Sequence, residues 1–177
     1  MLKKILISLI SIIVILLIIA LFLPKDFKFE KSIDIRKNKA EVFNYIKYLK
    51  NQNNWSVWAR MDPNMKKEYS GIDGTPGFIS RWDGNDDVGK GEQKIISLIE
   101  NSRIDYEIKF SKPWESVSPA WISVESIDSN TTLVFWGMSG KMPYPANLFT
   151  LFMDMENMLG KDMQEGLKNL KTEMEKE

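Results

Sequence analysis

Histidine and cysteine are both absent from this 177-residue chain. Their absence removes the usual proton-exchanging side chain near neutral pH, the usual thiolate nucleophile, disulfide bonds and nearly all zinc sites. The chain also lacks an excess of either charge, because 24 basic residues balance 24 acidic ones. A chain without a basic field has no general attraction for nucleic acid, so we expect no nucleic-acid partner. Any chemistry would have to come from carboxylates, Lys, Arg, Tyr or Ser.

The longest apolar stretch, Ile5–Leu23, is interrupted only by Ser8 and Ser11. A helix of this length rises about 28 Å and would cross most of a hydrocarbon core of about 30 Å. A cleaved signal peptide is the alternative, but its apolar run is usually shorter and followed by small residues, whereas this run ends in bulky residues and Pro24. We therefore expect residues 1–24 to be an uncleaved transmembrane anchor and residues 25–177 to be one folded domain.

The orientation of this anchor depends on the lysines that flank it. Lys3 and Lys4 precede the apolar run, and three further lysines follow it within the first strand region. We favour a single-pass arrangement with the N-terminus in the cytoplasm and the domain on the extracytoplasmic side. Pro24 ends the helix with almost no linker, which predicts that the domain lies close to the membrane surface.

The start of the domain predicts a strand followed by short helices. Residues 27–36 alternate between apolar and charged side chains, which is typical of a half-buried strand. Asn38 is placed to cap a helix whose capping-box position is Glu41. A further helical turn is expected near residues 49–53, and the segment that carries Trp55 and Trp58 is too irregular for a regular strand.

The remainder predicts a sheet and a closing helix. Strands are expected at residues 65–69, 78–83, 92–100, 104–110, 121–127 and 132–138, each bounded by turn residues. After them, apolar residues recur at spacings of four, four, three and four, which is one stripe on a helix. These residues are Leu159, Met163, Leu167, Leu170 and Met174. Such a stripe has to be covered, and the sheet is the element that can cover it.

Several local strings occur in an order that is similar to one superfamily. They are Ile33-Asp34-Ile35 with residues 40–46, residues 54–58, residues 88–91 and residues 147–170. Together they resemble the SRPBCC superfamily of START-like, helix-grip proteins, and most closely its polyketide cyclase/dehydrase branch. The resemblance implies an α+β fold in which a curved antiparallel sheet of about seven strands wraps around the long C-terminal helix. It also implies an elongated apolar cavity between helix and sheet. It transfers fold better than function, since the superfamily includes lipid carriers, hormone-binding proteins, cyclases and chaperone cofactors.

Aromatic residues make up 11% of the chain and supply most candidates for the lining of such a cavity. An ordinary core position is the alternative for each of them, and strand alternation lets at most half of the tryptophans point inward. Arginine could fix a carboxylate, tyrosine could donate a proton, and methionine suits a wall that adapts to its ligand. The candidate ligand-binding residues are Trp55, Trp58, Tyr69, Arg81, Trp82, Tyr106, Trp121, Trp136, Phe152, Met155 and Met163.

Two further segments have alternative readings. Asp83, Asn85 and Asp87 have the spacing of calcium-loop ligands, but Val88 and Lys94 replace the required glycine and glutamate, so we interpret the segment as a solvated turn. We expect neither a metal nor a cofactor. The apolar segment 148–153 is expected either to cover the cavity or to dip into the adjacent membrane.

These features favour a monomeric, membrane-anchored binding domain for a hydrophobic small molecule such as a lipid or an isoprenoid. A polyketide cyclase/dehydrase-type enzyme that uses Tyr or Arg is one alternative, although no catalytic constellation stands out. An envelope protein-interaction module is another. A cavity of about 300 Å³ or more between helix and sheet would favour binding.

Overall fold

The computed structural model describes residues 1–152 and 154–176, and of Met155 only the backbone. Its elements, in chain order, are α1 (Leu2–Phe22), β1 (Asp26–Ile35), α2 (Lys39–Ile46), η1 (Leu49–Asn51), α3 (Gln52–Trp55), α4 (Val57–Met61), β2 (Lys66–Ser70), β3 (Ile79–Asp83), β4 (Lys90–Ile99), β5 (Arg103–Lys112), β6 (Ser116–Ser126), β7 (Thr132–Lys141), η2 (Ala146–Leu151) and α5 (Met155–Met174).

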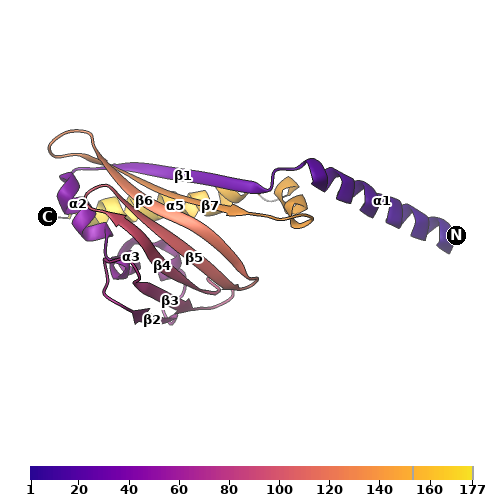
Figure 1. The fold of residues 1–177 in the computed structure, drawn as a ribbon, viewed down its shortest axis with the longest axis horizontal. Coiled ribbons are helices and arrows are strands. Elements are labelled where there is room, and N and C mark those ends of the chain that lie inside the picture. Colours follow the sequence, from indigo (N-terminus) through magenta and orange to yellow (C-terminus); the bar gives the residue numbers. More distant parts are fainter. Residues whose placement is uncertain (153, 177) are drawn as a thin grey trace.

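Seven antiparallel strands form one sheet in the order β1-β7-β6-β5-β4-β3-β2. The pairing of β4 with β5 shifts register between Ile95 and Ser97, an irregularity of the kind that bends a sheet. The sheet curves around α5, while α2 and α3 lie toward the same side (Figure 1). The predicted helix-grip architecture is confirmed.

The apolar stripe of α5 is buried against the concave face of the sheet. Met163, Leu167 and Leu170 are almost inaccessible, and they share one core with residues such as Ile122 and Val134 on the inner faces of β6 and β7. The predicted stripe is therefore confirmed, because a period of 3.6 residues places these side chains on one side of the helix. Helix α5 begins only after the apolar segment 148–153, because Asp154 caps it by accepting a hydrogen bond from the Asn157 amide at 2.9 Å.

Ion pairs fix the position of α5 along the edge strand β1. Lys31 contacts Glu156 at 2.8 Å, Asp34 contacts Lys171 at 2.8 Å, and Arg36 contacts Glu175 at 3.0 Å. Each pair is exposed and contributes little by itself. Together they follow the helix from its first turn to its last, so they select one register of α5 against the strand.

Helix α1 projects away from the sheet (Figure 1), and within it only Ala20 is buried. By length and composition it fits either a membrane span or a signal sequence. Its C-terminal end contacts the domain through η2, where the buried Asn147 side chain donates hydrogen bonds to two carbonyl oxygens of the α1 end. The end of the sheet formed by Asp26, Lys90, Lys112 and Lys141 therefore faces α1.

Candidate ligand cavity

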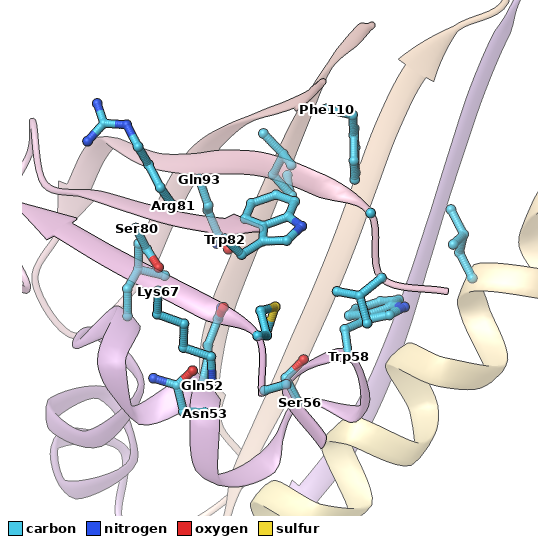
Figure 2. Close-up of a pocket in the computed structure, with 18 of the residues that line it drawn as sticks. Gln52, Asn53, Ser56, Trp58, Lys67, Ser80, Arg81, Trp82, Gln93 and Phe110 are labelled. Atoms are coloured by element: carbon cyan, nitrogen blue, oxygen red, sulfur yellow. The ribbon is translucent and has the colours of Figure 1, made fainter. Parts of the chain in front are cut away.

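A cavity of about 310 Å³ lies between the inner face of the sheet, helices α3 and α4, and the first half of α5. Its floor is buried and includes Ala120, Trp136 and Met163. Figure 2 shows the indoles of Trp58 and Trp82 turned toward this same space from α4 and β3. Its size is at the small end of the range typical of small-molecule sites.

Most of the cavity wall is apolar. The apolar residues that line it are Leu49, Trp58, Ala59, Met65, Trp82, Val88, Ile108, Phe110, Pro113, Ala120, Trp136, Met138, Leu159 and Met163. The indole of Trp136 holds a central place, because it meets Trp55 edge to face at 4.9 Å and Trp58 at 5.6 Å between ring centroids. Trp82 meets Phe110 in the same manner at 6.0 Å. Such contacts fix the indole planes and give the wall a defined shape.

Two glycines make room for these indoles. A Cβ atom at Gly91 would lie 2.6 Å from Cζ2 of Trp82, and one at Gly166 would lie 3.0 Å from Cζ3 of Trp136. Gly91 is the neighbour of Trp82 on the adjacent strand, so the indole lies flat across the backbone of β4. The shape of the cavity thus depends on positions without side chains as well as on the aromatic residues.

One side of the cavity is polar. Its polar side chains come from α3 and from β2 to β4, and they include Gln52, Asn53, Ser56, Lys67, Ser80 and Gln93. Asn53 is held by hydrogen bonds from its Nδ2 to the Lys50 carbonyl at 2.8 Å and to the Tyr69 hydroxyl at 2.9 Å. The Nε2 group of Gln52 is buried and has no hydrogen-bond partner within the described residues. Figure 2 shows the Lys67 side chain extending toward Gln52 and Asn53.

The cavity opens at the end of the sheet that faces α1. The exposed residues that line it, Asp86, Asp87, Lys112 and Pro113, all lie there, and we call these four residues the rim. Gly89, with a positive φ of 69°, brings the β3–β4 loop against the Lys112 carbonyl. The segment interpreted from sequence as a solvated turn is therefore one wall of the opening.

The structure brings five of the predicted site residues to the cavity. Trp58, Trp82, Trp136 and Met163 line it with their side chains. Arg81 also borders it, but its guanidinium group is ion-paired with Glu92 at 3.1 Å and points away from the cavity (Figure 2). Alternation along β3 explains this difference, since Ser80 and Trp82 face inward and Arg81 faces outward.

The other predicted residues lie elsewhere. Trp55 is fully buried behind Trp136, and the hydroxyl of Tyr69 is occupied by Asn53. Tyr106 is buried in the core and does not line the cavity, and burial raises the pKa of its hydroxyl. Phe152 is 80% exposed near α1. The side chain of Met155 lies outside the described residues.

Trp121 lies on the outer face of the sheet, away from the cavity. Its indole rests over Gly137 and donates a hydrogen bond from Nε1 to Glu30 at 2.5 Å. The cationic groups of Lys28 and Arg103 each lie 5.2 Å from the ring centroid. Its neighbours Ala120 and Ile122 point into the core. These contacts account for Trp121 as a buried residue of the convex face, with 6% of its surface exposed.

Sequence reasoning did not single out several lining residues. Ile108 and Phe110 lie on the inner face of β5, and their strict alternation with Ile104 and Tyr106 was a sufficient signal. Ser80 shares the face of Trp82 for the same reason. No local pattern indicates Lys67 or Gln93, because their position depends on how β2 and β4 pair with β3.

A curved antiparallel sheet that grips a C-terminal helix over a partly apolar cavity defines a helix-grip protein of the SRPBCC type. The sequence profile of the polyketide cyclase/dehydrase and lipid transport family matches residues 26–175. The chain belongs to this family, and its cavity is consistent with hydrophobic ligand binding. No curated protein sequence matches the chain significantly.

Solved structures show the same fold at low identity. The Aha1 dimer from Colwellia psychrerythraea is 16% identical with a TM-score of 0.59, and the match covers 84% of this chain and 96% of that one. A norcoclaurine synthase point mutant from Thalictrum flavum, in complex with a transition-state analogue, is 10% identical with a TM-score of 0.62, over 85% and 97% of the two chains. Ara h 8.0201 is 14% identical with a TM-score of 0.56, over 84% and 97%.

Proposed function

We propose that this protein is a membrane-anchored binding domain for a hydrophobic small molecule, of lipid or isoprenoid-like character, that carries a polar group at one end. The observation that carries this proposal is the cavity of about 310 Å³ with aromatic and methionine side chains on one side and amide, hydroxyl and ammonium groups on the other. Small-molecule sites typically combine such an apolar surface with a few placed polar groups.

The division of the cavity assigns an orientation to the ligand. An apolar portion fits between Trp58, Trp82 and Trp136, where the indole faces offer contact area. An oxygen-bearing head group fits near Gln52 and Lys67, because the unpartnered amide donor and the ammonium group favour an acceptor or an anion. A carboxylate or phosphate is the chemistry these donors suit best.

The anchor in this proposal is α1, with residues 1–24 as the membrane segment and residues 25–177 as the binding domain. Fourteen bulky apolar side chains of this helix are exposed, from Leu2 to Phe22. A helix that is apolar all round needs an apolar environment, and a bilayer supplies it. We assign the domain to the extracytoplasmic side and regard it as monomeric.

The structure offers less for the enzyme alternative. Arg81 is engaged by Glu92 outside the cavity, and the Tyr69 hydroxyl accepts a hydrogen bond from Asn53. The remaining lining groups within the described residues are amides, hydroxyls, two aspartates at the rim and two lysines. This set suits binding better than proton transfer, since no lining base is paired with a nucleophile.

Photo-crosslinking in lipid nanodiscs tests the binding proposal with the full chain. A diazirine-bearing palmitic acid is added, activated by light, and its adducts are mapped by peptide mass spectrometry. We expect adducts on α1 and on cavity residues such as Met163. Ala59→Trp places an indole in the cavity from its half-exposed position on α4, so it should remove the cavity adducts and keep those on α1.

Ala40→Trp is the matched control, because Ala40 is exposed on helix α2 outside the cavity lining. It should leave both sets of adducts unchanged. Wild-type adducts confined to α1 and η2, or cavity adducts that survive Ala59→Trp, would contradict the proposal.

A further inference from the structure

Exposed aromatic side chains gather at the end of the domain that faces α1. Among the described residues, every aromatic side chain that is more than half exposed lies there. These residues are Phe22 at 84%, Trp114 at 70%, Phe149 at 57% and Phe152 at 80%. Tyr144 lies in the same region and is 42% exposed.

These residues come from three separate chain segments. Phe22 ends α1, Trp114 lies in the β5–β6 hairpin, and the others belong to η2 or its borders. Strand register brings the segments to one end, since Asp26 pairs with Lys141 and Phe110 pairs with Ser116. Figure 1 shows η2 beside the C-terminal end of α1 and the β5–β6 tip at the same end of the sheet.

We propose that Trp114, Tyr144, Phe149 and Phe152 form a docking surface that inserts into the interface of the bilayer holding α1, and that this contact places the cavity opening against the lipid. The inference rests on the membrane anchor of the proposed function and adds a route for the ligand. Aromatic side chains are enriched at the membrane–water interface, where an apolar ring and a polar edge are both accommodated.

The bilayer is the occupant that the geometry selects. The docking surface is continuous with α1, because Asn147 in η2 donates hydrogen bonds to the carbonyl oxygens of Ala20 at 2.6 Å and Leu23 at 3.2 Å. A membrane that contains α1 therefore lies beside η2 without any further partner. An exposed apolar cluster of this kind is costly in water and marks an interaction surface.

The docking surface borders the rim of the cavity. Pro113 of the rim directly precedes Trp114 in the chain. Leu159, which also lines the cavity, lies near the start of α5 and follows η2. When the surface is docked, a hydrophobic molecule can pass between the leaflet and the cavity without crossing bulk water. That passage avoids exposing the apolar area of the molecule to water, which is unfavourable.

The absence of cysteine allows each position to be labelled alone with a single introduced thiol. Trp114→Cys, Phe149→Cys and Phe152→Cys are modified with the fluorophore NBD in the full chain and reconstituted into phosphatidylcholine vesicles. The matched control is Ile127→Cys in the β6–β7 turn at the opposite end, since Ile127 and Phe149 are both 57% exposed. All four positions are exposed, so the substitutions leave the core intact.

We expect blue-shifted emission and several-fold lower quenching by aqueous iodide at positions 114, 149 and 152 than at 127. Carbonate washing of the same vesicles reports on the anchor separately. If the chain stays in the vesicles but the labels at 114, 149 and 152 are quenched as strongly as the label at 127, the docking surface is overturned and the anchor is retained. Chain that is washed off would overturn both. Labels that are protected from iodide support the docking surface whatever the photo-crosslinking result. A lack of cavity adducts with the diazirine palmitic acid would count against the proposed function alone.

Discussion

The side-chain amide of Asn147 donates a hydrogen bond of 2.6 Å to the carbonyl oxygen of Ala20. The last carbonyls of a helix lack partners within the helix, and here a residue 127 positions later supplies one. Both residues are fully buried, so the bond is shielded from water. This contact joins α1 to the domain as a connection of defined geometry.

Replacing Asn147 with leucine should loosen that connection. The variant keeps a similar volume but removes the donor, which leaves the buried Ala20 carbonyl unsatisfied at a cost of about 1–3 kcal/mol. We expect the distance distribution between nitroxides on Ile13→Cys and Ile127→Cys, measured by pulsed EPR in nanodiscs, to broaden. The melting temperature of the domain should change little, since the bond lies outside the sheet.

Asn157→Leu provides the control for this experiment. Asn157 is an exposed asparagine at the start of α5, and its side chain bonds to Asp154 and not to α1. It should leave the distance distribution as narrow as in the wild type. An unchanged distribution in Asn147→Leu would show that the bond does not orient the domain.

Gly91→Ala should narrow the cavity. The added methyl group would meet the Lys109 carbonyl and Cζ2 of Trp82, the latter at 2.6 Å, so the indole has to move toward the cavity. Overpacking of this kind typically costs about 1–3 kcal/mol. We expect a lower melting temperature together with fewer cavity adducts of the diazirine fatty acid.

Gly137→Ala separates these two effects. A Cβ atom at position 137 would lie 2.7 Å from Nε1 of Trp121, so the added methyl group would displace that indole. The indole of Trp121 lies on the outer face of the sheet, away from the cavity. The variant should lose comparable stability and keep its cavity adducts. Equal loss of adducts in both variants would mean that destabilisation alone reduces labelling.

The periodic spacing of apolar residues allowed the architecture to be predicted from the sequence. The stripe from Leu159 to Met174 and the cap at Asn38 appear in the structure because each depends on neighbours within a few residues. The predicted strand 121–127 begins five residues too late, since β6 begins at Ser116. The missed part contains Pro119, and proline is uncommon in a central strand because it lacks an amide donor. Pro119 nonetheless pairs opposite Glu107 of β5. That pairing depends on the arrangement of the whole sheet and not on the residues near Pro119.

The residues of the candidate site were harder to predict from the sequence than the fold, for a physical reason. Trp82 and Trp121 are equally plausible from local sequence, yet one indole faces the cavity and the other faces outward. The difference depends on the register of β3 and β6 within the whole sheet. Arg81 shows the same limit, because its neighbour Ser80 occupies the inward position.

Acid should weaken the attachment of α5 to β1. The hydrogen bond from Lys171 lowers the pKa of Asp34 below its ordinary value of 3.8. Burial raises the pKa of Glu175, but hydrogen bonds from Arg36 outweigh it and leave the pKa below 4.5. Because both carboxylates bind protons less readily in the folded state, their stabilisation is present above these ordinary values and is lost as the pH falls through the lowered ones.

The double variant Asp34→Asn, Glu175→Gln should therefore melt at a lower temperature than the wild type at neutral pH. The two melting curves should converge as the pH falls through the lowered pKa values, because the wild-type carboxylates then become protonated. Asp26→Asn is the control, because Asp26 makes only a loose exposed pair with Lys141 at 3.7 Å. Parallel curves at all pH values would contradict the assigned role of these carboxylates.

Removing the hydroxyl of Tyr106 should stabilise the protein or leave its stability unchanged. This hydroxyl is buried without a hydrogen-bond partner in the described residues, so Tyr106→Phe removes an uncompensated polar group and should gain up to about 1 kcal/mol. Burial also raises the pKa of this hydroxyl above its ordinary value of 10.0, so the folded state holds the proton more tightly than the unfolded state. The folded protein therefore loses stability relative to the unfolded chain as the pH rises above 10.0. Denaturant titrations should show less alkaline weakening in Tyr106→Phe than in Tyr144→Phe, whose hydroxyl lies on an exposed residue. A loss above 1 kcal/mol would instead reveal a partner for this hydroxyl.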